Sequence, residues 1–95
     1  MSAYMVFTRT KTKDAKELEI YGKGAAASAQ GHPVKPLAFY GAHEDLEGPA
    51  TEGTVILEFP NVEAAKAWYN SPAYLQAREH RFKGGEYRVT LVQGV

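Results

Sequence analysis

The stretch 59–74 constrains the fold of this chain more than any other, because it contains two helix starts separated by a break. Pro60 ends the strand before it, since proline cannot donate a hydrogen bond to a neighbouring strand. Asn61 is a suitable N-cap for a first helix, and Ser71 followed by Pro72 is suitable for the start of a second. The sequence therefore predicts two helical segments joined at a sharp corner.

Segments rich in β-branched and aromatic residues lie on both sides of this corner, and one further long helical stretch precedes it. We expect strands at 3–10, 34–41, 54–59 and 87–93, and helices at 14–30, between 61 and 70, and at 72–82. Pro33 and Pro36 indicate an edge position or an irregular entry at the start of the second strand, and 42–53 is expected to be an exposed polar loop. The order β-α-β-β-α-β predicts an α+β, ferredoxin-like fold, in which helices cover one face of a four-stranded antiparallel sheet.

A chain of 95 residues is expected to form one domain over residues 1–95. A domain of this size buries only about 60–65% of its unfolded surface, so it is marginally stable alone. The face of the sheet without helices carries apolar residues on several strands, which should not be left in water. We therefore expect a homodimer through the open sheet face.

The balance of charge excludes several classes of partner. Lys+Arg and Asp+Glu number 11 each, so the chain lacks the basic excess of a nucleic-acid binder. It has no cysteine for a disulfide, a thiolate nucleophile or a metal. No apolar run approaches the ~20 residues of a membrane span, and the N-terminus lacks the basic start of a signal peptide. A cytoplasmic protein with no nucleic-acid or membrane partner is the expectation.

Several short motifs resemble those of one family. They are Leu46-Glu47-Gly48, Glu58-Phe59-Pro60, Ala64-Ala65, Ala67-Trp68-Tyr69-Asn70-Ser71-Pro72, Tyr74, Arg81 and Leu91-Val92-Gln93-Gly94. Over nearly its whole length the chain is similar to DUF1330, a family of uncharacterised bacterial domains. The resemblance implies a subunit of a dimeric α+β barrel, a superfamily that includes cofactor-free monooxygenases, heme-degrading enzymes and stress-responsive proteins. It implies no agreed activity, and this chain departs from the family pattern at Ala25-Ala26 and Gly31-His32-Pro33.

Two residues are candidates for catalysis. His32 follows the end of the first helix, where a charged imidazole is stabilised, and it could take a proton from carbon or from a phenol. Tyr21 faces the sheet from that helix, and its hydroxyl could donate to a developing oxyanion. The alternative for His32 is a surface residue at a helix end, and His80 is expected to face solvent.

Five further residues are candidates for ligand binding. Trp68, Tyr69 and Tyr74 gather at the corner and could line a cavity between the sheet and the helices, with core packing as the alternative. Arg78 and Arg81 lie three residues apart on one helix and could hold a carboxylate or phosphate. A salt bridge between subunits or a solvated helix face is the alternative for this pair.

The sequence thus predicts a small-molecule-binding homodimer, one form of which is a cofactor-free enzyme with oxygenase-like or isomerase-like chemistry. Its substrate would be a small organic molecule of aromatic or acidic character. The alternatives are a non-catalytic sensor, a stress-related or structural dimer and, less well supported, heme or metal binding. No phosphate loop, dinucleotide fingerprint or zinc motif is present, so no cofactor or metal ion is predicted.

Overall fold

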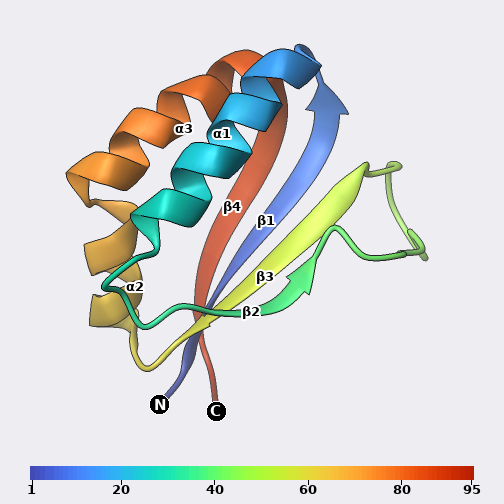
Figure 1. The fold of residues 1–95 in the computed structure, drawn as a ribbon. Coiled ribbons are helices and arrows are strands. Elements are labelled where there is room, and N and C mark those ends of the chain that lie inside the picture. The colour runs from blue at the N-terminus through green and yellow to red at the C-terminus, as the bar shows by residue number, and fades with distance from the viewer.

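The structure is a computed structural model that describes residues 1–95, and it shows an α+β fold with helices on one face of a sheet (Figure 1). In chain order the elements are β1 (Ala3–Thr12), α1 (Ala15–Ser28), β2 (Lys35–Phe39), β3 (Gly53–Phe59), α2 (Val62–Tyr69), α3 (Pro72–Gly84) and β4 (Gly85–Gln93). The strands form one antiparallel sheet in the order β2-β3-β1-β4. The predicted ferredoxin-like fold is therefore confirmed, with β2 at an edge of the sheet.

The corner between α2 and α3 forms as the sequence predicts. The Asn61 side chain accepts a hydrogen bond from the Ala64 amide at 2.7 Å. Ser71 Oγ accepts one from the Tyr74 amide at 3.3 Å and donates one to the Trp68 carbonyl at 2.7 Å. The serine therefore starts α3 and joins it to the end of α2, which satisfies polar groups that a helix end leaves unpaired.

The junction between α3 and β4 differs from the expected gap between a helix at 72–82 and a strand at 87–93, because the helix passes directly into the strand. A Cβ atom on Gly84 would lie 2.7 Å from the Leu18 side chain, and one on Gly85 would lie 2.8 Å from the Lys11 carbonyl oxygen. Both glycines are thus required by the close approach of neighbouring elements. None of the three helices has the length and apolar character needed to cross a membrane.

The two faces of the sheet differ sharply. Towards the helices, every second residue is buried along β3 and along β1 as far as Phe7; these are Ala3, Met5, Phe7, Gly53, Val55, Leu57 and Phe59. Tyr21, Trp68 and Tyr74 from the helices complete this core. On the other face lie half-buried and exposed side chains such as Tyr4, Val6, Ile56 and Val92, and no helix covers them (Figure 1).

Two glycines of α1 serve different purposes and give a matched test. A Cβ atom on Gly24 would lie 2.9 Å from the Cβ of Ala77, so Gly24 lets α1 and α3 pack closely. A Cβ atom on Gly22 would meet nothing within 4 Å. We expect Gly24→Ala to lower the free energy of unfolding by about 1–2 kcal/mol through overpacking, and Gly22→Ala to raise it by about 0.5–1 kcal/mol. Urea unfolding measures both, and effects of the same sign would contradict the packing.

Candidate functional site

A cavity of about 250 Å³ lies between α1 and the part of the sheet formed by β1, β2 and β3. Its inner wall consists of buried side chains that include Phe7, Tyr21, Leu57 and Trp68. Its mouth lies beside Phe39, which lines the cavity and is 67% exposed. Of its 16 lining residues 13 are hydrophobic, so the interior suits an apolar molecule.

The cavity exists because α1 presents small residues to this part of the sheet. Gly22, Ala25, Ala26 and Ala29 line it, at positions that repeat with the helical period. Larger side chains here would fill the space between the helix and the sheet. The side of α1 that faces the sheet is therefore a cavity wall over much of its length.

Arg9 of β1 is the charged residue among those that line the cavity. Its Nε donates to Glu52 Oε1 at 3.1 Å, and its guanidinium carbon lies 4.8 Å from the centre of the Tyr40 ring. Glu52 Oε1 also accepts a hydrogen bond from Thr12 Oγ1 at 2.5 Å. The bond from Thr12, together with the charge of Arg9, lowers the pKa of Glu52, so the carboxylate that positions Arg9 is ionised at neutral pH.

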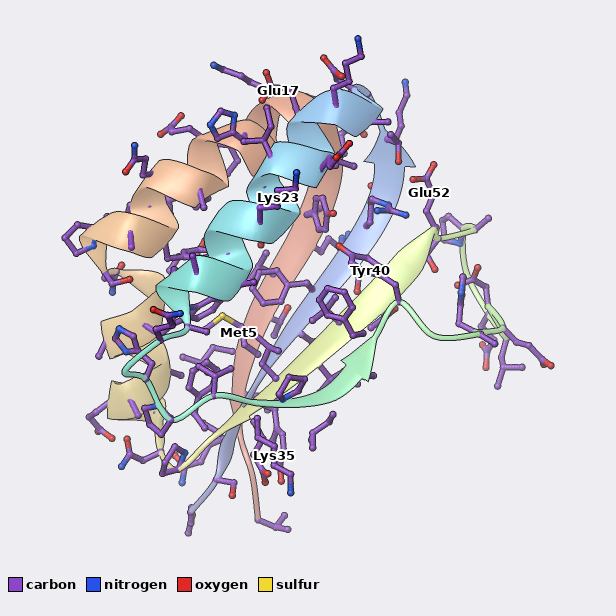
Figure 2. The ribbon with its side chains drawn as sticks, in the orientation of Figure 1. Met5, Glu17, Lys23, Lys35, Tyr40 and Glu52 are labelled. Atoms are coloured by element: carbon purple, nitrogen blue, oxygen red, sulfur yellow. The ribbon has the colours of Figure 1, made fainter.

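Two tyrosine hydroxyls meet at the cavity wall near Arg9. The Tyr40 and Tyr87 oxygens lie 2.8 Å apart, and both residues line the cavity. Figure 2 shows Tyr40 in the space between α1 and β3. Tyr40 has a positive φ of 52°, uncommon for a residue with a large side chain, and a Cβ atom on Gly53 would lie 2.6 Å from its ring. Burial raises the pKa of Tyr40, as does its bond with Tyr87, so it is neutral at physiological pH.

A second hydroxyl pair lies deeper, where Tyr21 of α1 meets Tyr74 of α3. Their oxygens are 2.9 Å apart, and burial raises the pKa of both residues. Arg81 lies behind this pair and is only 4% exposed. Its guanidinium carbon is 5.9 Å from the ring centres of Phe7 and Tyr21 and 5.3 Å from that of Tyr87. These three rings belong to the cavity wall, so a buried positive charge sits directly behind it.

The structure places two of the predicted site residues, Tyr21 and Trp68, in the cavity wall. The indole N–H of Trp68 donates to Ser28 Oγ at 3.1 Å and is therefore already used. Tyr74 is fully buried and lies behind the wall, where it contacts Tyr21 and Trp68. His32 is half-buried in the turn after α1 and is not among the residues that line the cavity.

The other predicted ligand-binding residues lie outside the cavity wall. Arg78 donates from Nη1 to the Tyr69 hydroxyl at 3.4 Å, whereas Arg81 turns inward. The two guanidinium carbons each lie 5.1 Å from the centre of the Phe82 ring. Both Nε atoms are buried without a hydrogen-bond partner, and the two arginines have separate surroundings apart from this shared ring.

The structure corrects the expectation that His80 faces solvent. The residue is half-buried, and its Nδ1 lies 2.6 Å from Glu17 Oε2. Sequence reasoning also missed Arg9, Tyr40 and Tyr87 as site residues. The alternation of side chains along a strand could have identified Arg9 as a site residue, because Arg9 follows Phe7 by two residues and so faces the same side of the sheet.

Histidine and carboxylate side chains are not among the residues that line the cavity. The chain also has no group of three or more His, Asp or Glu side chains placed to hold a metal ion. What the wall offers is an apolar surface, a guanidinium group and tyrosine hydroxyls. This set can bind an organic molecule and stabilise negative charge on it.

Fold and cavity together define a ferredoxin-like α+β domain with an internal apolar site. Residues 2–95 match the family DUF1330, described as a domain of unknown function, and the chain belongs to this family. The sequence matches no curated protein.

Several solved structures share the fold. RPA0582, a protein of unknown function from Rhodopseudomonas palustris, has a TM-score of 0.75 and 19% identity, with coverage of 99% of this chain and 82% of that one. SnoaB, a cofactor-independent oxygenase from Streptomyces nogalater, has a TM-score of 0.66 and 11% identity, with coverage of 99% and 93%. A dimeric protein of unknown function from Bacteroides fragilis has a TM-score of 0.59 and 11% identity, with coverage of 98% and 96%. At these identities the likeness concerns the fold alone.

Proposed function

We propose that this protein is a homodimer in which each subunit binds one small, largely apolar organic molecule in the cavity between α1 and the sheet. The observation that carries this proposal is an open space of about 250 Å³ with a hydrophobic wall and a few polar groups. An apolar cavity of about 150 Å³ is enough to bind benzene in another protein. The size therefore suits a molecule of about one aromatic ring with substituents.

The proposed dimer uses the sheet face that lacks helices. Tyr4, Val6, Ile56 and Val92 give that face apolar surface at the centre and at the β4 edge. The cavity lies on the opposite face, so such a dimer leaves both cavities accessible. The dimeric state described for the Bacteroides fragilis protein of the same fold supports this arrangement.

Binding is better supported than catalysis. A proton abstraction needs a base within hydrogen-bond reach of the substrate, and the wall contributes no histidine or carboxylate for this. Tyr21 could still stabilise negative charge on a substrate that is already ionised. SnoaB, a cofactor-independent oxygenase, has the same fold. His32 would contribute only to a substrate that extends beyond the cavity wall. A non-catalytic sensor uses the same cavity without these steps.

A variant that fills the mouth of the cavity tests the proposal. Ala26 lines the cavity at an exposed position of α1, so Ala26→Phe should occlude it. With the neutral probe para-trifluoromethylbenzamide, followed by fluorine NMR, we expect affinity to fall about tenfold or more, because each buried methylene lost from the contact costs about 0.8 kcal/mol.

The control is Ala67→Phe, which adds the same ring to an exposed position of α2 away from the cavity. It should bind the probe as the unmodified protein does. Trp68 gives a second signal, because the only tryptophan of the chain stands in the cavity wall. Equal binding by both variants, or a probe that leaves Trp68 fluorescence unchanged while binding, would place the molecule elsewhere and reject this site.

A further inference from the structure

Building on this proposed binding function, we infer that the ligand is a small organic acid bound as its anion. Its carboxylate pairs with Arg9 near the mouth of the cavity, and its apolar body extends towards Trp68. This assigns a ligand class to the cavity and gives Arg9 and Arg81 separate parts in selecting it. The contacts of the two arginines carry the inference.

Arg9 is held in a position that leaves part of its guanidinium group unused. The hydrogen bond to Glu52 is made by Nε, at 3.1 Å, and the ring of Tyr40 lies against the group with its centre 4.8 Å from the guanidinium carbon. The Tyr87 hydroxyl also interacts with the guanidinium group, but no carboxylate pairs with its terminal nitrogens. The N–H groups that remain on these nitrogens can bind a second partner, and parallel N–H groups match the geometry of a carboxylate. A positioned arginine in an otherwise apolar wall is the arrangement expected for recognition of an acid.

The Tyr40–Tyr87 pair adds a hydrogen-bond donor beside Arg9. When two hydroxyls share one hydrogen bond, one of them still has a proton to donate. Both tyrosines line the cavity, and their oxygens are 2.8 Å apart. A ligand oxygen at this wall can therefore accept a bond from the pair as well as from Arg9.

Arg81 supplies positive charge from behind the wall. It is 4% exposed, forms no ion pair, and its Nε has no hydrogen-bond partner. A buried charge without a counter-ion is unfavourable, and charge interactions are strong where water is excluded. The rings of Phe7, Tyr21 and Tyr87 separate Arg81 from the cavity. An anion in the cavity would partly compensate this charge, whereas a neutral molecule would not.

The wall places no negative charge against such a ligand. None of its residues is acidic, and Glu52 lies outside the wall, where it binds Arg9 and Thr12. An acid that enters the cavity therefore meets two cations and no neighbouring carboxylate except the one that positions Arg9. The electrostatic preference is for a single negative charge at the Arg9 end.

The test compares two probes of nearly equal shape, para-trifluoromethylbenzoate and para-trifluoromethylbenzamide, by fluorine NMR at neutral pH. We expect the unmodified protein to bind the benzoate about tenfold or more tightly than the benzamide. Arg9→Met should abolish this preference, because it should lower affinity for the benzoate about tenfold or more beyond any change for the benzamide. Arg81→Met should reduce the preference by about threefold, since its effect is through space.

Lys23→Met is the matched control. It removes the same charge from an exposed position of α1 that does not line the cavity, so it should leave the affinity for both probes unchanged. Equal affinity of the unmodified protein for the two probes, or a benzoate preference that persists in Arg9→Met, would overturn the assignment of an acid while leaving the cavity as a binding site. If neither probe binds, the proposed binding function fails and this inference with it.

Discussion

Val6→Asp should convert the protein from a dimer to a monomer. Val6 lies in the middle of the open sheet face, where it pairs with Ile56 of β3 and with Thr90 of β4. In the proposed dimer the aspartate of each subunit would be removed from water without a counter-ion, at a cost of several kcal/mol. A two-fold interface contains every residue twice, so one substitution changes both sides of the contact.

Light scattering during size exclusion measures the mass directly. The unmodified protein should have twice the mass of one 10.4 kDa chain, and the Val6→Asp variant should have the mass of a single chain. Leu46→Asp is the control, because Leu46 is 85% exposed in the loop before β3 and lies outside the sheet. A monomeric unmodified protein, or a Val6→Asp protein that remains dimeric, would contradict dimerisation through this face. Dissociation caused equally by Leu46→Asp would also remove the basis for it.

The elements that could be predicted from the sequence are those fixed by local contacts. Asn61 and Ser71 each accept a hydrogen bond from an amide three residues ahead, so the two helix starts depend on a few adjacent residues. The edge position of β2 follows from Pro36, which cannot donate within a central strand. Both features are visible in one stretch of sequence and do not require knowledge of the rest of the fold.

The partner of Glu17 could not be predicted from neighbouring residues in the sequence. Three residues after Asp14, it fits the pattern of a capping box. In the structure Asp14 accepts from the Lys16 amide, and Glu17 pairs with His80 of α3, which is 63 residues away in the sequence. Only the packing of α3 against α1 makes this second partner available.

The charged and hydroxyl groups of the cavity could not be predicted either, because they come together only through contacts between distant parts of the chain. Arg9 belongs to β1 and Tyr87 to β4, whereas Tyr40 directly follows β2, and only the sheet brings the three together. Arg81 was paired with Arg78 because the two are neighbours on a helix face. Arginine is seldom fully buried, so nothing in the local sequence indicates that one of the two enters the core and the other does not.

The free energy of unfolding is expected to fall steeply above pH 10. Tyr21, Tyr40 and Tyr74 have pKa values raised above the ordinary value of 10.0, chiefly by burial. In the unfolded chain these hydroxyls ionise near pH 10, whereas burial in the folded protein moves their ionisation to higher pH. Below pH 10 their contribution to stability is complete; above it the unfolded state gains from ionisation by about 1.4 kcal/mol per tyrosine and pH unit.

The contributions of the three tyrosines sum to at most about 4 kcal/mol per pH unit, which is large against the 5–15 kcal/mol typical of whole domains. Urea unfolding at pH 8, 10 and 11 and at one protein concentration, followed by Trp68 fluorescence, measures the slope. Tyr21→Phe removes the tyrosine whose pKa is raised most, so its slope should be shallower by at least about a third. This comparison is independent of the stability that the variant loses at pH 8, where Tyr74 lacks its hydroxyl partner. A slope equal to that of the unmodified protein would show that Tyr21 ionises as readily in the fold as outside it, and that the inner wall of the cavity is open to water.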